Sequence, residues 1–166
     1  MTPEHLPARF ASPPPSLYSE LLMAPKKKHV LFVCFGNACR SPMAEAVALK
    51  EASDIIAPSS AGLFPLGEIP QHTRKTLEES GYSAEGLASK GIEAGAWQRA
   101  DLVINLSGRA RELEFDDFEK VEDWDVADPY GEGAIFYQRT LFDIQVRVRE
   151  LAKRLRDGQP AAAKRE

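Results

Sequence analysis

Segments rich in apolar and β-branched residues alternate with helix-forming segments along most of this chain, and no other feature constrains the fold as strongly. Short apolar runs predict four strands, at residues 29–33, 55–59, 102–106 and 120–126. Helical patterns predict helices at residues 41–52, 71–80 and 136–155. Strands separated by helices pair in parallel, because each helix returns the chain across one face of the sheet. We therefore expect a single three-layer α/β domain, with a four-stranded parallel sheet between helices on both faces.

The two ends of the chain differ in composition from this domain, which we place at residues 28–157. Residues 1–27 contain six prolines, three of them consecutive at 13–15, with three Ser and three Ala, which is typical of a flexible leader. Within it, residues 17–23 have enough apolar character for one helical turn and no more. Residues 158–166 are polar or small, and we expect a disordered tail. A chain of 166 residues suits one domain with such ends.

Composition argues against several classes of protein. The formal net charge of −4 gives no support for a nucleic-acid or membrane partner. No apolar run reaches the roughly 18 residues of a membrane-spanning helix, and we expect no secretory signal. Cys34 and Cys39 are the two cysteines, too few for a disulfide scaffold, so we expect a reducing, cytoplasmic location. The three histidines do not cluster with cysteines at ligand spacing, and we expect neither a metal nor another cofactor.

Residues 34–41, between the first strand and the first helix, carry the clearest chemistry. They lie where parallel α/β folds bind ligands, at the carboxyl end of a strand and the start of a helix. Gly36 and Asn37 tolerate the left-handed backbone of a tight loop, whose inward amides form a nest for an anion. A helix start capped by Ser41 adds unpaired amides, and Arg40 offers a planar fork to two phosphate oxygens. The sequence therefore predicts a site for a phosphate-type anion.

Cys34 stands at the base of this predicted cradle and is the candidate nucleophile. The donors that hold phosphate also stabilise a thiolate, and Ser41 can donate its hydroxyl to the sulfur. A cysteine followed six residues later by an arginine is a weak signal alone, because short motifs arise by chance. The alternative is a buried structural cysteine at a strand end. The complete loop sequence, placed directly after a strand, disfavours that alternative.

At these residues the chain resembles the low-molecular-weight protein tyrosine phosphatase family. The stretch Val-Leu-Phe-Val-Cys-Phe-Gly-Asn-Ala-Cys-Arg-Ser-Pro-Met-Ala-Glu-Ala, residues 30–46, is very close to the signature of that family. Ser-Ala-Gly at 60–62 and Asp-Pro-Tyr at 128–130, ahead of a long C-terminal helix, also fit. The resemblance runs from about Lys28 to Leu155. It implies a flavodoxin-like strand order and a protein phosphatase that hydrolyses phosphotyrosine.

Carried onto this sequence, the resemblance implies a two-step reaction without a metal. Cys34 attacks phosphorus and forms a cysteinyl-phosphate, while Asp128 protonates the leaving oxygen and then activates water. Arg40 and the loop amides stabilise the charge on the transferring group. The other residues implied to bind phosphate or substrate are Phe35, Gly36, Asn37, Ala38, Cys39, Ser41 and Tyr130. Those implied to hold the loop in shape are Asn37, Ser41 and Ser60. Cys39 is also implied to form a reversible disulfide with Cys34, which protects the nucleophile from over-oxidation.

Individual residues also have plainer interpretations. Asp128 precedes a proline, and by sequence alone Asp-Pro is a turn opener; its place ahead of the last helix, as in the family, favours catalysis. Cys39 fits a plain core position as well as a redox role. The aromatic residues Phe136, Tyr137 and Phe142 are expected in the core.

The predicted substrate mouth departs from the family pattern. Two aromatic residues often follow the family's Asp-Pro pair, whereas here Tyr130 is followed by Gly131. A tryptophan common in the loop after Ser-Ala-Gly is absent, and Phe64 or Leu66 is the candidate to replace it. These differences affect substrate preference more than chemistry.

Two more departures concern the loop itself. No histidine occurs at residues 86–88, where a family histidine supports the loop, and His72 is interpreted as a surface residue at a helix N-terminus. Relatives that act on phosphoarginine tend to carry threonine where this chain has Ala38, yet the Asp-Pro-Tyr-Gly segment with Tyr137 and Thr140 resembles that arginine-phosphatase branch. The expected substrate, a phosphorylated protein or peptide, is therefore open between phosphotyrosine and phosphoarginine.

Two other functions compete with the phosphatase hypothesis. Residues 100–111 and 124–129 resemble thioredoxin-coupled arsenate reductases of the same fold, but that relay needs two more cysteines and Ser107 stands where the first is expected. An arsenate reductase that uses a small thiol is the weaker alternative. A non-enzymatic binder of phosphorylated partners is disfavoured by the presence of Cys34, Arg40 and Asp128 together.

Overall fold

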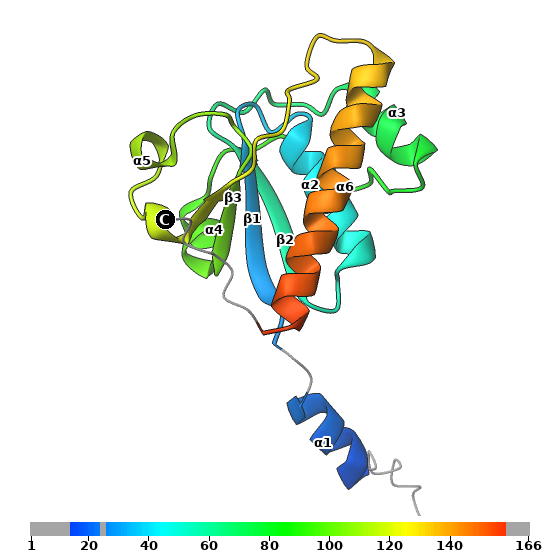
Figure 1. Cartoon of the computed structure of the whole chain (residues 1–166), viewed down its shortest axis with the longest axis vertical. Coiled ribbons are helices and arrows are strands. Elements are labelled where there is room, and N and C mark those ends of the chain that lie inside the picture. Colours follow the sequence, from blue (N-terminus) through cyan, green and yellow to red (C-terminus); the bar gives the residue numbers. More distant parts are fainter. Residues whose placement is uncertain (1–13, 24–25, 159–166) are drawn as a thin grey trace, which may run out of the picture.

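The structure, a computed structural model, describes residues 14–23 and 26–158. The strands are β1 (Lys28–Cys34), β2 (Ile56–Gly62), β3 (Leu102–Asn105) and β4 (Val121–Asp123). The helices are α1 (Pro15–Met23), α2 (Arg40–Glu51), α3 (Gln71–Glu79), α4 (Ala94–Arg99), α5 (Arg111–Glu114) and α6 (Ala134–Arg156). Figure 1 shows these helices packed around the sheet, with α1 lying apart from it.

The four strands form one parallel sheet in the order β2-β1-β3-β4. The predicted fold class and strand order are therefore confirmed. β1 is central, and Cys34 at its carboxyl end pairs with Gly62 at the end of β2. A Cβ atom on Gly62 would lie 2.7 Å from the backbone nitrogen of Asn37. Glycine is needed here because the loop after β1 packs directly against the end of β2.

The core has two parts, one on each face of the sheet. α2, α3 and α6 cover one face, and alternate residues of β1 such as Val30 and Phe32 point into that part. α4 and the segment around α5 cover the other face, where Leu31 and Val33 pack. The buried stripe of α6 consists of Tyr137, Thr140, Leu141, Ile144, Val148, Leu151, Ala152 and Leu155. This helix therefore packs along the sheet as its periodicity predicts.

Two expectations are wrong: the burial of Phe136 and Phe142, and the length of the helix predicted at residues 17–23. Phe136 and Phe142 are 45% and 65% exposed, because they lie off the buried stripe of α6; Tyr137, which lies on it, is buried as expected. α1 spans nine residues, Pro15–Met23, where one turn at most was predicted. Residues 1–13 of the predicted leader and 159–166 of the predicted tail lie outside the described residues.

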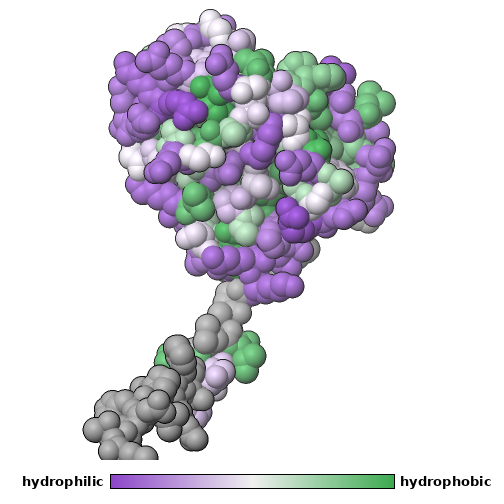
Figure 2. Space-filling view, turned by 180° about the vertical axis from the view of Figure 1, so that it is seen from behind, coloured by the Kyte–Doolittle hydropathy of each residue, from purple (hydrophilic) through white to green (hydrophobic). Residues whose placement is uncertain are grey.

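The face of the molecule opposite to that in Figure 1 is mainly hydrophilic. In Figure 2, which shows the molecule from behind, hydrophobic residues form separate spots between polar ones. Within residues 14–23 and 26–158, no helix is both long and apolar enough to cross a bilayer.

Candidate active site

Residues 34–41 lead from the end of β1 into the start of α2, and four of their carbonyl groups accept hydrogen bonds from partners outside the loop. Leu63 N, Phe64 N, Leu66 N and Thr73 Oγ1 donate to the carbonyls of Cys34, Phe35, Gly36 and Ala38, at 3.1, 2.8, 2.9 and 2.8 Å respectively. The C=O of a trans peptide and the following N–H point in opposite directions. These bonds therefore turn the loop amides away from the outer partners and toward the interior of the loop. Such a concave set of amides is an anion-binding nest.

Asn37 fixes the shape of this nest from inside. Its φ is 46°, in the left-handed region that asparagine tolerates. Its Nδ2 donates to Ser41 Oγ at 2.8 Å and to Ser60 Oγ at 3.0 Å, and its Oδ1 accepts from Lys90 N at 2.9 Å. Ser60 in turn donates to the carboxylate of Glu45. The side chain of Asn37 thus uses both donors and its acceptor to hold the strained turn.

Cys34 is buried at the base of the loop, 2% exposed, with its sulfur 3.0 Å from Ser41 Oγ. The Ser41 hydroxyl also lies 3.2 Å from the carbonyl of Ala61, which accepts its hydrogen. A hydroxyl has one hydrogen to donate, so Ser41 can turn it from Ala61 to the sulfur when Cys34 is ionised. The predicted cap at Ser41 is wrong, because α2 begins at Arg40 without a side-chain cap and the Ser41 hydroxyl is engaged with Cys34.

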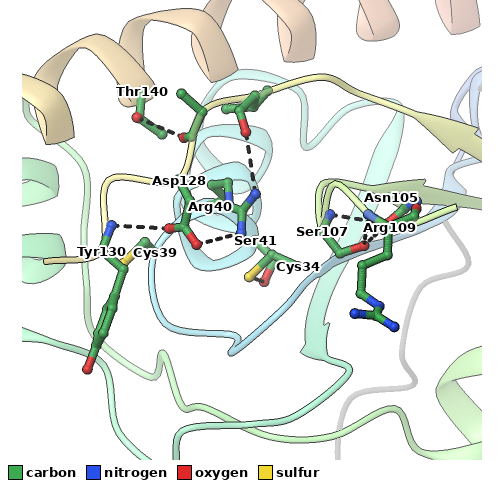
Figure 3. Close-up of polar contacts among 12 residues, drawn as sticks. Cys34, Cys39, Arg40, Ser41, Asn105, Ser107, Arg109, Asp128, Tyr130 and Thr140 are labelled. Atoms are coloured by element: carbon green, nitrogen blue, oxygen red, sulfur yellow. Dashed lines mark hydrogen bonds and ion pairs between the residues drawn. The ribbon is translucent and has the colours of Figure 1, made fainter. Parts of the chain in front are cut away.

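Arg40 is 5% exposed, and its guanidinium points toward Asp128, which lies in the segment between β4 and α6 (Figure 3). Its Nη2 donates to Asp128 Oδ2 at 2.8 Å, and its Nη1 to Val126 O at 3.4 Å. Its buried Nε has no hydrogen-bond partner among the described residues. An Nε–H together with an Nη–H is the edge of a guanidinium that grips two oxygens of an oxyanion. The orphaned Nε therefore marks where an anion can complete the hydrogen bonding of this side chain.

Asp128 lies in the loop between β4 and α6 and faces Arg40 from across the site. Its Oδ1 accepts from Tyr130 N at 3.1 Å, so the carboxylate lies between the Tyr130 amide and the Arg40 guanidinium (Figure 3). Thr140 on α6 donates to Ala127 O at 3.2 Å and anchors the same loop. The structure thus brings Cys34, Arg40 and Asp128, 94 residues apart in sequence at the extremes, into one site.

Cys39 is buried, and both cysteines are free. Its thiol donates to Tyr137 Oη at 3.6 Å. Burial raises the pKa of the Cys39 thiol, and burial beside Cys39 also raises the pKa of Tyr137. Cys39 is therefore held as a neutral thiol against Tyr137, and its disulfide with Cys34 stays a prediction.

Apolar side chains surround the mouth of the loop. The rings of Phe35 and Phe64 lie 5.1 Å apart, and the two side chains are 41% and 60% exposed. Leu66, 46% exposed, packs on Gly36. Tyr130 is 55% exposed. Phe64 and Leu66 thus both lie beside the loop, and their role in place of the missing tryptophan stays a prediction.

Ser107 occupies a turn at the end of β3, the strand next to β1. Its Oγ donates to Asn105 Oδ1 at 2.6 Å, and Asn105 Nδ2 donates to the carbonyl of Arg109 at 2.8 Å. Figure 3 shows this cluster beside Cys34 but without a bond to it. The hydroxyl of Ser107 therefore stabilises its own turn.

Four residues near the loop have no counterpart among the sequence-predicted site residues: Glu45, Thr73, Ser89 and Lys90. The Lys90 amide donates to Asn37 Oδ1 and so supports the loop, in a segment where no histidine occurs. A backbone amide leaves no signal in a sequence, and only the Ser-Lys pair near the missing histidine could have drawn attention.

His72 is exposed as expected, although its ring lies 5.2 Å from that of Tyr137. Within the described ranges, no group of three or more His, Cys, Asp or Glu side chains could hold a metal ion.

Comparisons with known proteins agree with this geometry. The family described as low molecular weight phosphotyrosine protein phosphatase matches residues 29–161. The protein-arginine-phosphatase of Bacillus subtilis is 30% identical over 146 residues, which is 76% of this chain and 96% of that protein. An arsenate reductase solved in a phosphate-binding state is 32% identical, with a TM-score of 0.69 over 77% of this chain and 98% of its own. A mutant of the arginine phosphatase YwlE with a phosphorylated active-site serine is 27% identical, with a TM-score of 0.71 over 81% and 99%. The chain therefore belongs to the low-molecular-weight phosphotyrosine protein phosphatase family.

Proposed function

We propose that this protein is a cysteine-dependent phosphatase that hydrolyses phosphotyrosine in proteins. The observation that carries the proposal is the site around Arg40. Its buried Nε has no hydrogen-bond partner among the described residues. It lies on a loop that has four carbonyls bonded outward and a buried thiol as its first residue. A phosphate dianion bound there meets inward amides, a guanidinium edge and a nucleophile.

Substrate binding has to rearrange one contact of the resting site. Asp128 occupies Arg40 Nη2, and a phosphate that takes both Nη2 and Nε displaces the carboxylate. Asp128, which is 46% exposed, then keeps its bond to Tyr130 N but no longer contacts Arg40. Its carboxyl group can therefore face the leaving oxygen. The arginine thus changes partner from general acid to substrate.

The first step transfers the phosphoryl group to sulfur. The Cys34 thiolate attacks phosphorus, the bond between phosphorus and the tyrosine oxygen breaks, and protonated Asp128 gives its proton to that oxygen. Arg40 and the loop amides hold the equatorial oxygens throughout. The products are a cysteinyl-phosphate and the dephosphorylated tyrosine side chain of the substrate protein.

The second step releases phosphate. The Asp128 carboxylate takes a proton from a water molecule, which attacks phosphorus as the bond to sulfur breaks. The electron pair returns to Cys34, where Ser41 can donate a hydrogen bond to the thiolate. Both cysteines are free, which suits the reducing cytoplasmic compartment expected for such a thiolate.

The apolar mouth supports an aryl substrate. The tilted ring pair of Phe35 and Phe64, together with Leu66, offers a flat apolar surface beside the nest. An aromatic ring packs on such a surface with favourable edge and face contacts. A tyrosyl ring suits it better than a polar guanidino group.

A protein arginine phosphatase is the second candidate. It is favoured by the similarity to the Bacillus subtilis enzyme over 96% of that protein. The two functions are distinguished by measuring kcat/KM for phosphotyrosine and phosphoarginine peptides of matched sequence. The peptide with the higher kcat/KM identifies the substrate class. Arsenate-dependent oxidation of a small thiol, faster than either hydrolysis, would instead favour the arsenate reductase alternative.

The general reaction has a direct test. Purified protein with para-nitrophenyl phosphate and a metal chelator should turn over the substrate. Turnover should vanish in Cys34→Ser and fall strongly in Asp128→Ala. Activity that survives Cys34→Ser, or that the chelator abolishes, would contradict the mechanism.

A further inference from the structure

The connection between α3 and α4 passes directly behind the phosphate loop. Ser89 Oγ donates to Gly36 O at 3.0 Å, and Lys90 N donates to Asn37 Oδ1 at 2.9 Å. Lys90 O accepts from Gly62 N at 2.9 Å. Residues 89 and 90 therefore join the loop after β1 to the end of β2.

Ser89 has a second contact that links the loop to the substrate mouth. Its Oγ accepts from Gly67 N at 3.0 Å, while the neighbouring Leu66 N donates to the same Gly36 carbonyl at 2.9 Å. One hydroxyl thus bridges the phosphate loop and the segment that carries Phe64 and Leu66. It uses its single hydrogen on Gly36 and a lone pair on Gly67.

The peptide between Gly36 and Asn37 is the one in the loop that most needs such a restraint. Glycine permits a wide range of backbone angles, so this peptide can rotate more readily than its neighbours. Rotation would turn the Gly36 carbonyl inward, where its partial negative charge would meet the anion, and would turn the Asn37 amide outward.

We propose that Ser89 is a positioning residue, which keeps the Gly36 carbonyl outward and the Asn37 amide pointed at the bound phosphate. This inference rests on the anion-binding role proposed above for the loop. Ser89 acts through Gly36 and does not touch the substrate. Because it also holds Gly67, its loss loosens the mouth and the nest together.

The test compares wild type with Ser89→Ala, Ser89→Thr and the control Ser83→Ala. Ser83 lies in the same connection, is exposed, and accepts a bond from Glu85 N without contacting the loop. Binding of inorganic phosphate is measured by isothermal titration calorimetry, and the pH profile of Cys34 alkylation by iodoacetamide is recorded. Thermal unfolding is followed for all four proteins, and para-nitrophenyl phosphate turnover is measured in parallel.

Loss of the hydroxyl should weaken phosphate binding about three- to tenfold, the range expected for one or two hydrogen bonds. It should also shift the alkylation profile to higher pH, because one amide no longer supports the thiolate. Ser89→Thr should restore both readouts, and Ser83→Ala should leave both at wild-type values. In turnover, KM should rise more than kcat falls.

The proposal is overturned if Ser89→Ala binds phosphate as tightly as wild type with an unchanged alkylation profile. It is also overturned if Ser83→Ala causes the same losses, or if threonine fails to restore binding in a protein of wild-type thermal stability. Phosphate binding and alkylation do not require turnover. An inactive wild type that still binds phosphate would therefore refute the proposed reaction while leaving the role of Ser89 to be decided by these comparisons.

Discussion

Asp128→Asn should separate two properties of the site, because it is expected to strengthen anion binding while it abolishes proton donation. In the resting structure Asp128 Oδ2 and Arg40 Nη2 are 2.8 Å apart, so in the proposed reaction the carboxylate would compete with the substrate for the guanidinium. Asparagine keeps an oxygen that can accept from Tyr130 N, and the turn of the loop is retained. The substitution therefore removes one charge and little else.

The size of the effect follows from two contributions. The ion pair is half-exposed, with 46% of the Asp128 side chain accessible, and such pairs contribute about 0.2–1 kcal/mol. Removing the repulsion between a carboxylate and a nearby dianion contributes about 1–2 kcal/mol at the high effective dielectric of a half-exposed group. Together these give about 2 kcal/mol, so inorganic phosphate should bind about thirtyfold more tightly.

Calorimetric titration of phosphate into both proteins measures the first effect, and steady-state kinetics measures the second. Loss of a general acid should lower kcat by roughly a hundredfold or more. The loss should be larger for phenyl phosphate than for para-nitrophenyl phosphate, because nitrophenolate leaves without a proton. Phosphate binding that is unchanged or weaker, or an equal loss of kcat for both esters, would refute the reasoning.

Buried polar groups near the loop give three further expectations. Thr73→Val leaves the carbonyl of Ala38 without its buried donor, so the free energy of unfolding in urea should fall by about 1–3 kcal/mol; an unchanged value would contradict the role of this bond. Burial raises the pKa of Cys39, so the folded protein holds this proton more tightly than the unfolded chain. The free energy of unfolding should therefore fall as the pH rises above about 8.5. Thermal unfolding between pH 7 and 10 measures this loss of stability, which should be smaller in Cys39→Ala. After inactivation by peroxide, dithiothreitol should restore the activity of wild type but not that of Cys39→Ala. Equal recovery of activity in both proteins would contradict the redox role of Cys39.

The sequence predicts the strands and the loop between β1 and α2 well because their signals are local. The apolar run of β1 and the Gly-Asn turn after it identify themselves over a few residues. β2 is less well predicted: it runs from Ile56 to Gly62 where residues 55–59 were expected. Pairing with β1 carries it on to Gly62, opposite Cys34, and this pairing is not visible in one segment.

The rest of the site depends on contacts between distant segments. The α4 and α5 helices are six and four residues long, too short to produce a clear periodic pattern. The bonds from Ser89 and Lys90 to the loop span 53 residues, and a single sequence carries no signal of such pairings. Phe136 and Phe142, expected in the core, are exposed because their positions lie off the buried stripe of α6.

The long reach of these contacts also sets the order in which the site can be assembled. A chain made from its N-terminus carries Cys34 early, but the Lys90 amide that secures Asn37 arrives 53 residues after that asparagine, and Asp128 arrives 88 residues after Arg40. Contacts of such separation form after local structure, because closing a long loop costs entropy before the contact can compensate for it. The thiol is thus present early in synthesis, whereas the groups that would activate it come together only in the completed fold. Affinity for an oxyanion should therefore report on native tertiary structure, and a partly folded chain should have the cysteine without the anion site.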